Sequence, residues 1–346
     1  MSLLKSLDGV LHKTFCRIAL LLPKKPRQAS GEVLIIRPGG MGDLTCADIA
    51  LNELGLDSTH FTWLIETRSK SWAEYRGLPH LCYDLDPFKT LSQVWNRYDL
   101  VINTEQFFGL AEAYALLSAT KTGRIASFQA NRGSRWSDII APYDWRDEHE
   151  TIAFARLFVQ ALELSHDEKK RPSRNRLHPP STPPLVLIAG RQSPSRRLSL
   201  EAWVALIAQW HRERPFLIAA SPEDAEFADQ IASSFTGLAR RFTGSFPDLC
   251  RQISTSEEIF TMDGGAVHIA SFFGVPTLAL FTSGRDRKWL PLGQGSRILR
   301  RSDLACQPCT KFGQVPPCPN QYACLQIENL APTEATPSTV RSENRI

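Results

Sequence analysis

The sequence predicts an α/β protein with two doubly wound domains, in each of which helices cover a parallel sheet. Three observations predict this class. Aliphatic runs that suit buried strands alternate with segments of helical periodicity, and the alternation occurs in two series. A charged, proline-rich linker, residues 166–184, separates the series and has almost none of the large apolar side chains that a core requires. A chain of 346 residues with 42% hydrophobic content is long enough for about two domains.

The first series occupies residues 31–165. Its strand patterns are rich in β-branched and aliphatic residues, and its helix patterns repeat apolar residues every three or four positions. The expected strands are residues 32–37, 60–67 and 98–105, and the expected helices are residues 42–54, 109–119 and 148–164. Because strands and helices alternate, we expect the strands to run parallel.

The second series occupies residues 185–330. The expected strands are residues 184–190, 215–221, 258–265 and 276–283, and the expected helices are residues 199–210, 222–235 and 266–274. Residues 331–346 are rich in polar residues and proline, so we expect them to be disordered. Two such domains bind ligands at the carboxyl ends of their strands, which predicts a central cleft between them.

The charge of the chain is concentrated in an N-terminal arm, residues 1–30. The formal net charge is +4, and the arm contains six basic residues against a single acid, Asp8. The remaining chain is therefore close to neutral. A nucleic-acid-binding protein needs a basic face on its body, so this distribution argues against a nucleic acid partner.

The arm has the pattern of a basic amphipathic helix. Its apolar residues at helical spacing are Leu3, Leu7, Val10, Leu11, Phe15, Ile18 and Leu22. The longest uninterrupted apolar run, residues 18–22, is far shorter than the roughly 20 residues of a membrane-spanning helix. Two interpretations remain: a helix that lies on the anionic inner face of a bacterial membrane, and a helix that packs on the body of the protein.

A glycine-rich turn follows the first expected strand. The stretch EVLIIRPGGMGDL places Gly39, Gly40 and Gly42 before the acid Asp43. It lacks the Gly-Lys-Ser/Thr of a P-loop and the G-x-G-x-x-G of a dinucleotide site. Glycines let the backbone approach a ligand closely, and the following helix N-terminus favours an anion. From this stretch alone, Asp43 suits helix capping better than catalysis.

A second turn of the same kind lies in the second series. The segment FTMDGGAVHIASFFG passes from a strand through Asp263 and Gly264 into a helix that contains His268. The free amides of Gly265 and Ala266, together with the helix dipole, suit a phosphate group, which indicates diphosphate binding. The alternative is a tight turn with Asp263 as its N-cap, which leaves His268 unexplained.

Together, the two motifs resemble glycosyltransferase family 9, the heptosyltransferases and their relatives. The segment DGGAVHIASFFGVPTLALFTSGRDRKWLP is similar to the family's D-T/S-G-x-x-H motif region, and RPGGMGDL to its R-x-x-x-x-G-D motif; the likeness covers residues 32–330. The resemblance implies the GT-B fold and Asp43 as catalytic base. It also implies Arg196 as the phosphate contact, with Arg197 beside it, and Glu223 near the ribose or base of the donor.

The resemblance also implies an activity. We expect inverting, metal-independent transfer of a heptose from an ADP-heptose-like donor to a lipopolysaccharide core or related lipid-linked glycan, by a cytoplasmic enzyme peripheral to the inner membrane. A protein acceptor, a nucleotide-sugar epimerase and a non-catalytic sugar-nucleotide binder remain alternatives on the same fold. The sequence departs from the family pattern at Gly264, where a Thr or Ser hydroxyl is usual, and the missing hydroxyl removes one phosphate contact.

Four of the eight cysteines cluster near the C-terminus in CQPCTKFGQVPPCPNQYAC, namely Cys306, Cys309, Cys318 and Cys324. Four thiolates have the ligand count of a tetrahedral zinc or iron site. Such a site is structural because it leaves no open position for a substrate. The last two cysteines are spaced more loosely than a C-x2-C knuckle, so packed free thiols are the alternative.

Overall fold

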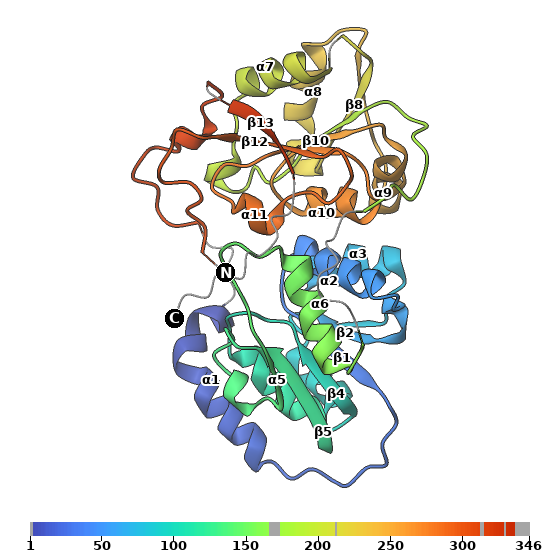
Figure 1. Ribbon diagram of the computed structural model, residues 1–346, viewed down its shortest axis with the longest axis vertical. Coiled ribbons are helices and arrows are strands. Elements are labelled where there is room, and N and C mark those ends of the chain that lie inside the picture. The colour runs from blue at the N-terminus through green and yellow to red at the C-terminus, as the bar shows by residue number, and fades with distance from the viewer. Residues whose placement is uncertain (1–2, 166–173, 212, 312–314, 329, 336–346) are drawn as a thin grey trace. The chain divides into compact units, whose positions relative to one another are not determined.

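The computed structural model describes residues 3–165, 174–211, 213–311, 315–328 and 330–335. The chain forms two compact units, each described here by itself. The N-unit comprises residues 1–145 and 150–170, and the C-unit comprises residues 146–149 and 171–346. Each unit is a sheet with helices packed on it, as Figure 1 shows. Residues 166–173 of the expected linker lie outside the described residues.

The N-unit contains a six-stranded sheet in which every pairing is parallel. Its strands are β1 (Val33–Arg37), β2 (Thr62–Ile65), β3 (His80–Cys82), β4 (Tyr98–Asn103), β5 (Ala119–Phe128) and β6 (Ile139–Ala141). They are ordered β3-β2-β1-β4-β5-β6, the order of a doubly wound sheet. The three strands expected from the sequence are β1, β2 and β4, which lie in the centre of the sheet.

Helices pack against this sheet. They are α1 (Leu3–Leu21), α2 (Met41–Glu53), α3 (Lys70–Arg76), α4 (Pro87–Val94), α5 (Leu110–Ser118) and α6 (Glu150–Ala161), with short 3-10 turns η1 (Ser58–His60), η2 (Thr67–Ser69) and η3 (Ser134–Trp136). The helices expected at residues 42–54, 109–119 and 148–164 are α2, α5 and α6, with ends that differ by up to three residues.

The C-unit repeats the same strand order. Its sheet consists of β7 (Leu185–Ile188), β8 (Phe216–Ala220), β9 (Ala239–Arg241), β10 (Ile259–Met262), β11 (Thr277–Leu280), β12 (Arg297–Arg301) and β13 (Leu330–Glu334). The order β9-β8-β7-β10-β11-β12 matches that of the N-unit, and β13 adds an antiparallel strand beside β12. The expectation of disorder is therefore wrong for residues 331–334, because β12 supplies their backbone hydrogen-bond partners; residues 336–346 lie outside the described residues.

The helices of the C-unit are α7 (Leu200–His211), α8 (Ala225–Ser233), α9 (Phe246–Thr255), α10 (Gly265–Phe272) and α11 (Asp286–Trp289), with 3-10 turns η4 (Pro194–Arg196), η5 (Pro222–Asp224) and η6 (Ala323–Leu325). Phe260 lies at the centre of the core, with Trp203 and Trp210 packed against its ring. In both units the strand order reverses beside the first strand, between β1 and β4 and between β7 and β10. Ligands bind at the carboxyl ends of the strands at such switch points.

The N-terminal arm packs on the body of the N-unit, where α1 lies against α5. The buried Asp8 carboxylate accepts a hydrogen bond from the Leu110 N–H (2.7 Å) at the start of α5. Lys24 Nζ donates to the carbonyls of Leu116 (2.5 Å) and Ala119 (2.6 Å) at its end. A negative group at the N-terminus and a positive group at the C-terminus both complement the α5 dipole. Among the described residues, no helix has the length and apolar content needed to span a membrane.

Candidate functional site

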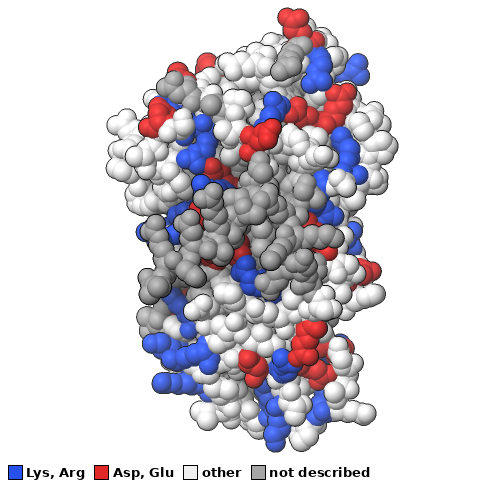
Figure 2. All heavy atoms as spheres, in the orientation of Figure 1, with Lys and Arg blue, Asp and Glu red and all other residues white. Residues whose placement is uncertain are grey.

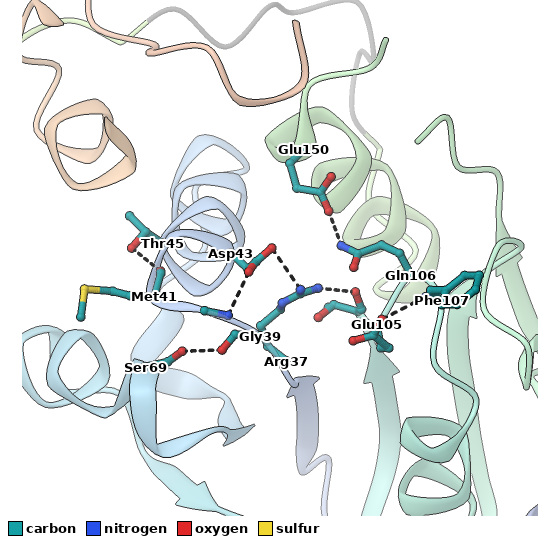
Figure 3. Close-up of polar contacts among 12 residues, drawn as sticks. Arg37, Gly39, Met41, Asp43, Thr45, Ser69, Glu105, Gln106, Phe107 and Glu150 are labelled. Atoms are coloured by element: carbon teal, nitrogen blue, oxygen red, sulfur yellow. Dashed lines mark hydrogen bonds and ion pairs between the residues drawn. The ribbon is translucent and has the colours of Figure 1, made fainter. Parts of the chain in front are cut away.

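The glycine turn of the N-unit holds an ion pair. Arg37 is the last residue of β1, and Asp43 lies in the first turn of α2. Arg37 Nη2 lies 3.2 Å from Asp43 Oδ1, and Asp43 Oδ2 accepts a hydrogen bond from the Gly40 N–H (2.9 Å), as Figure 3 shows. Asp43 therefore caps the N-terminus of α2, as the capping interpretation predicts. However, its side chain remains 27% exposed, so one side of the carboxylate is open.

The pair explains the glycine at position 39. A Cβ there would lie 2.7 Å from Arg37 Nη2 and 3.0 Å from Asp43 Oδ2, which is too close for either contact. Ser69 fixes the turn by donating from Oγ to the Gly39 carbonyl (2.8 Å). Gly40 is the extended N-cap of α2, and Gly42 lies inside the helix. The three predicted glycines therefore lie together, and the role of Gly39 is to make room for two charged groups.

Arg37 is buried, with only 3% of its side chain exposed, and it is held on several sides. Its Nη1 donates to the Thr104 carbonyl (2.6 Å) after β4. Burial lowers the pKa of Arg37, but Asp43, Glu105 and Glu150 together outweigh burial, and the pKa is raised overall. Its Nε has no hydrogen-bond partner among the described residues. Arg37 is thus a fixed cation that orients the Asp43 carboxylate.

Further polar side chains gather at this edge of the sheet. Glu150, at the start of α6, accepts hydrogen bonds from the Gln106 amide and from the Tyr143 hydroxyl (2.9 Å). Burial, followed by Glu150, raises the pKa of Tyr143. Glu105 accepts from the Phe107 N–H (3.0 Å). No local sequence pattern indicates these residues, because they follow β4 and begin α6 and are far apart along the chain.

The C-unit holds a second ion pair at its own switch point. Arg196 ends η4 after β7, and Asp263 follows β10. Arg196 Nη2 lies 3.0 Å from Asp263 Oδ2, with the Asp263 side chain 5% exposed and that of Arg196 27% exposed. A Cβ at Gly284 would lie 1.9 Å from Asp263 Oδ2, and one at Gly190 would lie 3.1 Å from Arg196 Cδ. Glycines again make room for the pair, but here the arginine is the more exposed partner.

The turn after Asp263 leads into α10. Gly264 is its N-cap in an extended conformation, and α10 begins at Gly265, followed by Ala266, so the first-turn amides lack intrahelical acceptors. His268 is buried and lies edge-on to Trp289, with 5.4 Å between the ring centroids. Burial, followed by the charge of His268, lowers the pKa of His149 to about 3. His268 is packed against Trp289, and the donor-binding roles of His268, of Arg196 and of the first amides of α10 stay predictions.

The two remaining donor candidates lie on the surface of the C-unit. Arg197 is exposed, and its Nε donates to the Arg191 carbonyl (3.0 Å). It lines a pocket of about 440 Å³ together with Tyr322 and Leu325. Glu223 is exposed on η5, and hydrogen bonds from backbone and from Ser221 lower its pKa.

The sequence analysis missed an ion pair beside Glu223. Arg191 Nε lies 3.1 Å from Asp224 Oδ1, and the Arg191 guanidinium carbon lies 3.4 Å from the centroid of the Phe227 ring. Arg191 follows β7 and Asp224 follows β8, so the pair fixes two loops at the carboxyl edge of the sheet. A lone arginine and one of two adjacent acids give no local signal of such a contact.

The four C-terminal cysteines lie close enough to affect one another. Burial raises the pKa of Cys324 to about 11, with smaller effects from Cys309, Cys318 and Cys306, and the Tyr322 N–H donates to Cys318 Sγ (3.3 Å). None of the eight cysteines forms a disulfide. Among the described residues, which omit 312–314 of this loop, no three His, Cys, Asp or Glu side chains are arranged to hold a metal ion. A structural zinc or iron stays a prediction.

These sites can be compared with known proteins. The model of glycosyltransferase family 9 (heptosyltransferase) matches residues 88–318. A search for similar sequences among curated proteins gives no significant match.

Solved structures share the fold. E. coli ADP-heptose lps heptosyltransferase II is 14% identical, with a TM-score of 0.59 over 78% of this chain and 90% of that one. E. coli heptosyltransferase WaaC, solved with ADP-2-deoxy-2-fluoro heptose, is 17% identical, with a TM-score of 0.61 over 78% of this chain and 93% of that one. A glycosyl transferase family 9 protein from Veillonella parvula is 12% identical, with a TM-score of 0.61 over 78% and 86%. The predicted GT-B architecture of two Rossmann-like units is confirmed.

Proposed function

Because this chain belongs to glycosyltransferase family 9, we propose that it transfers a heptose from ADP-heptose to a lipopolysaccharide core or related lipid-linked bacterial glycan. The family makes it a glycosyltransferase of the heptosyltransferase type. The named donor follows from the solved relatives that carry ADP or an ADP-heptose analogue. The lipid-linked acceptor follows from the relative described as an lps heptosyltransferase.

The reaction assigns one role to each ion pair. The Asp43 carboxylate accepts the proton of the acceptor hydroxyl while that oxygen attacks the anomeric carbon. The bond from the anomeric carbon to the diphosphate oxygen breaks on the opposite face, so the configuration inverts and ADP leaves with the electron pair. Arg196 and the amides of Gly265 and Ala266 bind the diphosphate and stabilise its charge. With these donors in place, the transfer requires no metal ion.

One observation carries this proposal. The buried partner of the ion pair is the arginine in the N-unit and the carboxylate in the C-unit. In the N-unit the arginine is buried and the carboxylate is the more exposed partner, which suits a base. In the C-unit the carboxylate is buried and the arginine is the more exposed partner, which suits a phosphate ligand. An arginine fork offers paired donors to phosphate oxygens.

The remaining assignments belong to the same proposal. Arg197 and Glu223 line the donor side near the nucleotide, and Asp263 and His268 support the turn beneath it. The enzyme works in the cytoplasm at the inner face of the inner membrane, where a lipid-linked acceptor is located. If the cysteine cluster holds zinc or iron, the metal is structural, because four thiolates leave no position for a substrate.

The test is calorimetric titration with ADP, GDP, UDP and CDP, followed by transfer assays with ADP-heptose and a heptose-deficient lipopolysaccharide core. We expect selective ADP binding that Arg196→Ala weakens about tenfold to a hundredfold, because a charge-assisted hydrogen bond contributes about 1.5–3 kcal/mol. Asp43→Asn should keep ADP binding. Arg251→Ala, which removes an exposed arginine of α9 that pairs with Asp248, is the matched control.

Other outcomes identify the alternatives. If no nucleotide binds, the proposal is wrong and only the fold and family remain. Conversion of the sugar nucleotide to its epimer without an acceptor would indicate an epimerase. ADP binding with no turnover, and no effect of Asp43→Asn on cellular glycan, would indicate a non-catalytic binder. Transfer to a polypeptide in place of the lipopolysaccharide core would indicate a protein-directed enzyme.

A further inference from the structure

Where the side chains of helix α1 are described, the buried ones are small or polar. Asp8, His12, Cys16 and Ala19 are buried and recur at helical spacing. Asp8 carries much of the attachment, because its carboxylate binds the Leu110 N–H and lies 3.2 Å from Arg132 Nη1. Among the described side chains of α1, none of the buried ones is a large apolar residue, although an amphipathic helix normally buries such residues.

From Phe15 to Leu22, the large apolar side chains are exposed. The described residues include nine exposed large hydrophobic side chains, and five of them lie on α1 and the position after it: Phe15, Ile18, Leu20, Leu21 and Leu22. Leu21 is 84% exposed. Single exposed apolar side chains are ordinary, but several exposed large apolar side chains within eight residues indicate an interaction surface.

The exposed charges of the segment itself are all of one sign. Residues 11–31 contain no acid, and their exposed charged residues are Lys13, Arg17, Lys25 and Arg27. Figure 2 shows Lys and Arg gathered on the part of the surface where Figure 1 places α1. An apolar group surrounded by cations complements a surface with an apolar interior and anionic headgroups.

We propose that the outer face of α1 and the turn after it, residues 13–27, is a docking surface for an anionic lipid bilayer. Phe15, Ile18 and Leu21 enter the boundary between headgroups and acyl chains, and the flanking cations contact lipid phosphates. The inference rests on the proposed function in choosing a lipid over a protein partner. A second copy of the chain is a poor occupant, since a face-to-face pair would bring the same four cations together.

The docked helix need not leave the body to bind. Asp8 and Lys24 fasten α1 and the following turn to both ends of α5, and they do so through groups that lie off the outer face. The bilayer is therefore contacted by a surface that is part of the N-unit. Membrane binding in this form holds the domain that carries Asp43 at the lipid surface, where a lipid-linked acceptor is found.

The test is co-sedimentation of the full chain with vesicles of phosphatidylcholine alone and of phosphatidylcholine with about 30% phosphatidylglycerol. We expect binding to the anionic vesicles, weaker binding at high salt, and little binding to the neutral vesicles. Ile18→Ser with Leu21→Ser should reduce the vesicle partition coefficient by about tenfold for each side chain. Lys13→Glu with Arg17→Glu should reduce it on the anionic vesicles only.

The control is Leu85→Ser with Phe88→Ser, a pair from the same unit in which Phe88 is 87% exposed. It removes a pair of apolar groups elsewhere that is at least as exposed as the pair Ile18 and Leu21, and it should leave vesicle binding unchanged. The proposal is overturned if the wild-type chain ignores anionic vesicles, or if both double serine variants bind alike. A dimer in sedimentation velocity that Ile18→Ser with Leu21→Ser dissociates would also overturn it. ADP titration of the same samples distinguishes these results from a failure of the transferase proposal.

Discussion

The two units have the same strand order and place an Arg–Asp pair at the same switch point, yet the pairs are inverted. In the N-unit, Arg37 is 3% exposed and Asp43 is 27% exposed; in the C-unit, Arg196 is 27% exposed and Asp263 is 5% exposed. The chemical groups are identical, and so is the type of contact. What differs is which partner reaches solvent, and this determines whether the site offers a carboxylate or a guanidinium.

In each ion pair, the buried side chain restricts the conformation of the exposed one. A side chain that ends in a fixed ion pair loses little further freedom when it meets a ligand, so the ion pair pre-organises the site. Both pairs also depend on missing side chains, at Gly39 in the N-unit and at Gly284 in the C-unit. The comparison predicts that removing an exposed partner affects chemistry or binding, whereas removing a buried partner affects stability.

The largest effect is expected on turnover at Asp43. Asp43→Asn should lower the rate of transfer by about 10²–10⁴-fold, because an amide cannot accept the proton of the acceptor hydroxyl. The midpoint of thermal unfolding should fall only modestly. Buried Arg37 loses its nearest counter-ion, but Glu105 and Glu150 remain beside it, and the amide oxygen still accepts from the Gly40 N–H. Asp57→Asn, which removes an exposed capping carboxylate of the same unit, should retain activity. Equal rates for wild type and Asp43→Asn would contradict the assignment.

The buried partners should behave in the opposite way. Arg37→Met removes the buried cation and leaves Asp43 and the Thr104 carbonyl without it, which should cost about 3 kcal/mol of unfolding free energy. Asp263→Asn should cost about 2 kcal/mol for the same reason in the C-unit. Urea unfolding measures both. If Arg37→Met and Asp263→Asn both leave the unfolding free energy unchanged, the inverted-pair comparison fails.

A third carboxyl group, that of Glu112, extends the comparison, because its hydrogen-bond donors are neutral groups and not an arginine. Glu112 is buried and accepts from the Asn103 amide (2.7 Å) and the Ser137 hydroxyl. Burial raises its pKa from the ordinary 4.5 to about 7, and the two hydrogen bonds oppose this only in part. The folded state therefore favours the neutral form. Its contribution to stability is complete below pH 4.5 and is lost as the pH rises to about 7.

Glu112→Gln tests this reasoning. Between pH 5 and 7 the wild-type chain should lose about 2 kcal/mol of unfolding free energy through Glu112, and the variant should lose that much less. Urea unfolding at several pH values measures the difference. A variant with the same pH dependence as wild type would show that Glu112 is not the group responsible.

The smallest effect is expected at Gly264. The nearest atom to a Cβ at this position is the Met262 carbonyl oxygen at 4.0 Å, and the backbone is extended, so a serine fits without strain. Gly264→Ser supplies an N-cap hydroxyl to α10 and one more donor to a diphosphate. We expect about a two- to threefold gain in ADP affinity by calorimetry. A loss of affinity would show that the turn needs glycine for a reason other than space.

The sequence predicts the central elements and misses the peripheral ones. β1, β4 and β10 are short aliphatic runs buried on both faces, so composition alone identifies them. β5 begins with polar residues, and β13 contains a proline, so neither has the pattern of a buried strand. Both exist because a neighbouring strand supplies their hydrogen bonds.

The same limit applies to the site. Local motifs identify Asp43 and Asp263 because each follows a strand at a glycine turn. They do not reveal the pairing of Arg196 with Asp263, which are 67 residues apart, or the contact of Asp8 with α5. The arm has the sequence pattern of an amphipathic helix, but part of its apolar residues are exposed in the structure. The buried acid Asp8 determines which face of the helix contacts the body.

The attachment of α1 also has a consequence for synthesis on the ribosome. Asp8 and the Leu110 amide that it caps are 102 residues apart, so at about 5–20 residues per second the helix emerges roughly 5–20 seconds before its partner exists. During that interval the nascent arm has no protein surface to cover its buried stripe. The order of translation therefore gives a membrane or a chaperone the first opportunity to meet this segment, before the domain that will hold it has folded.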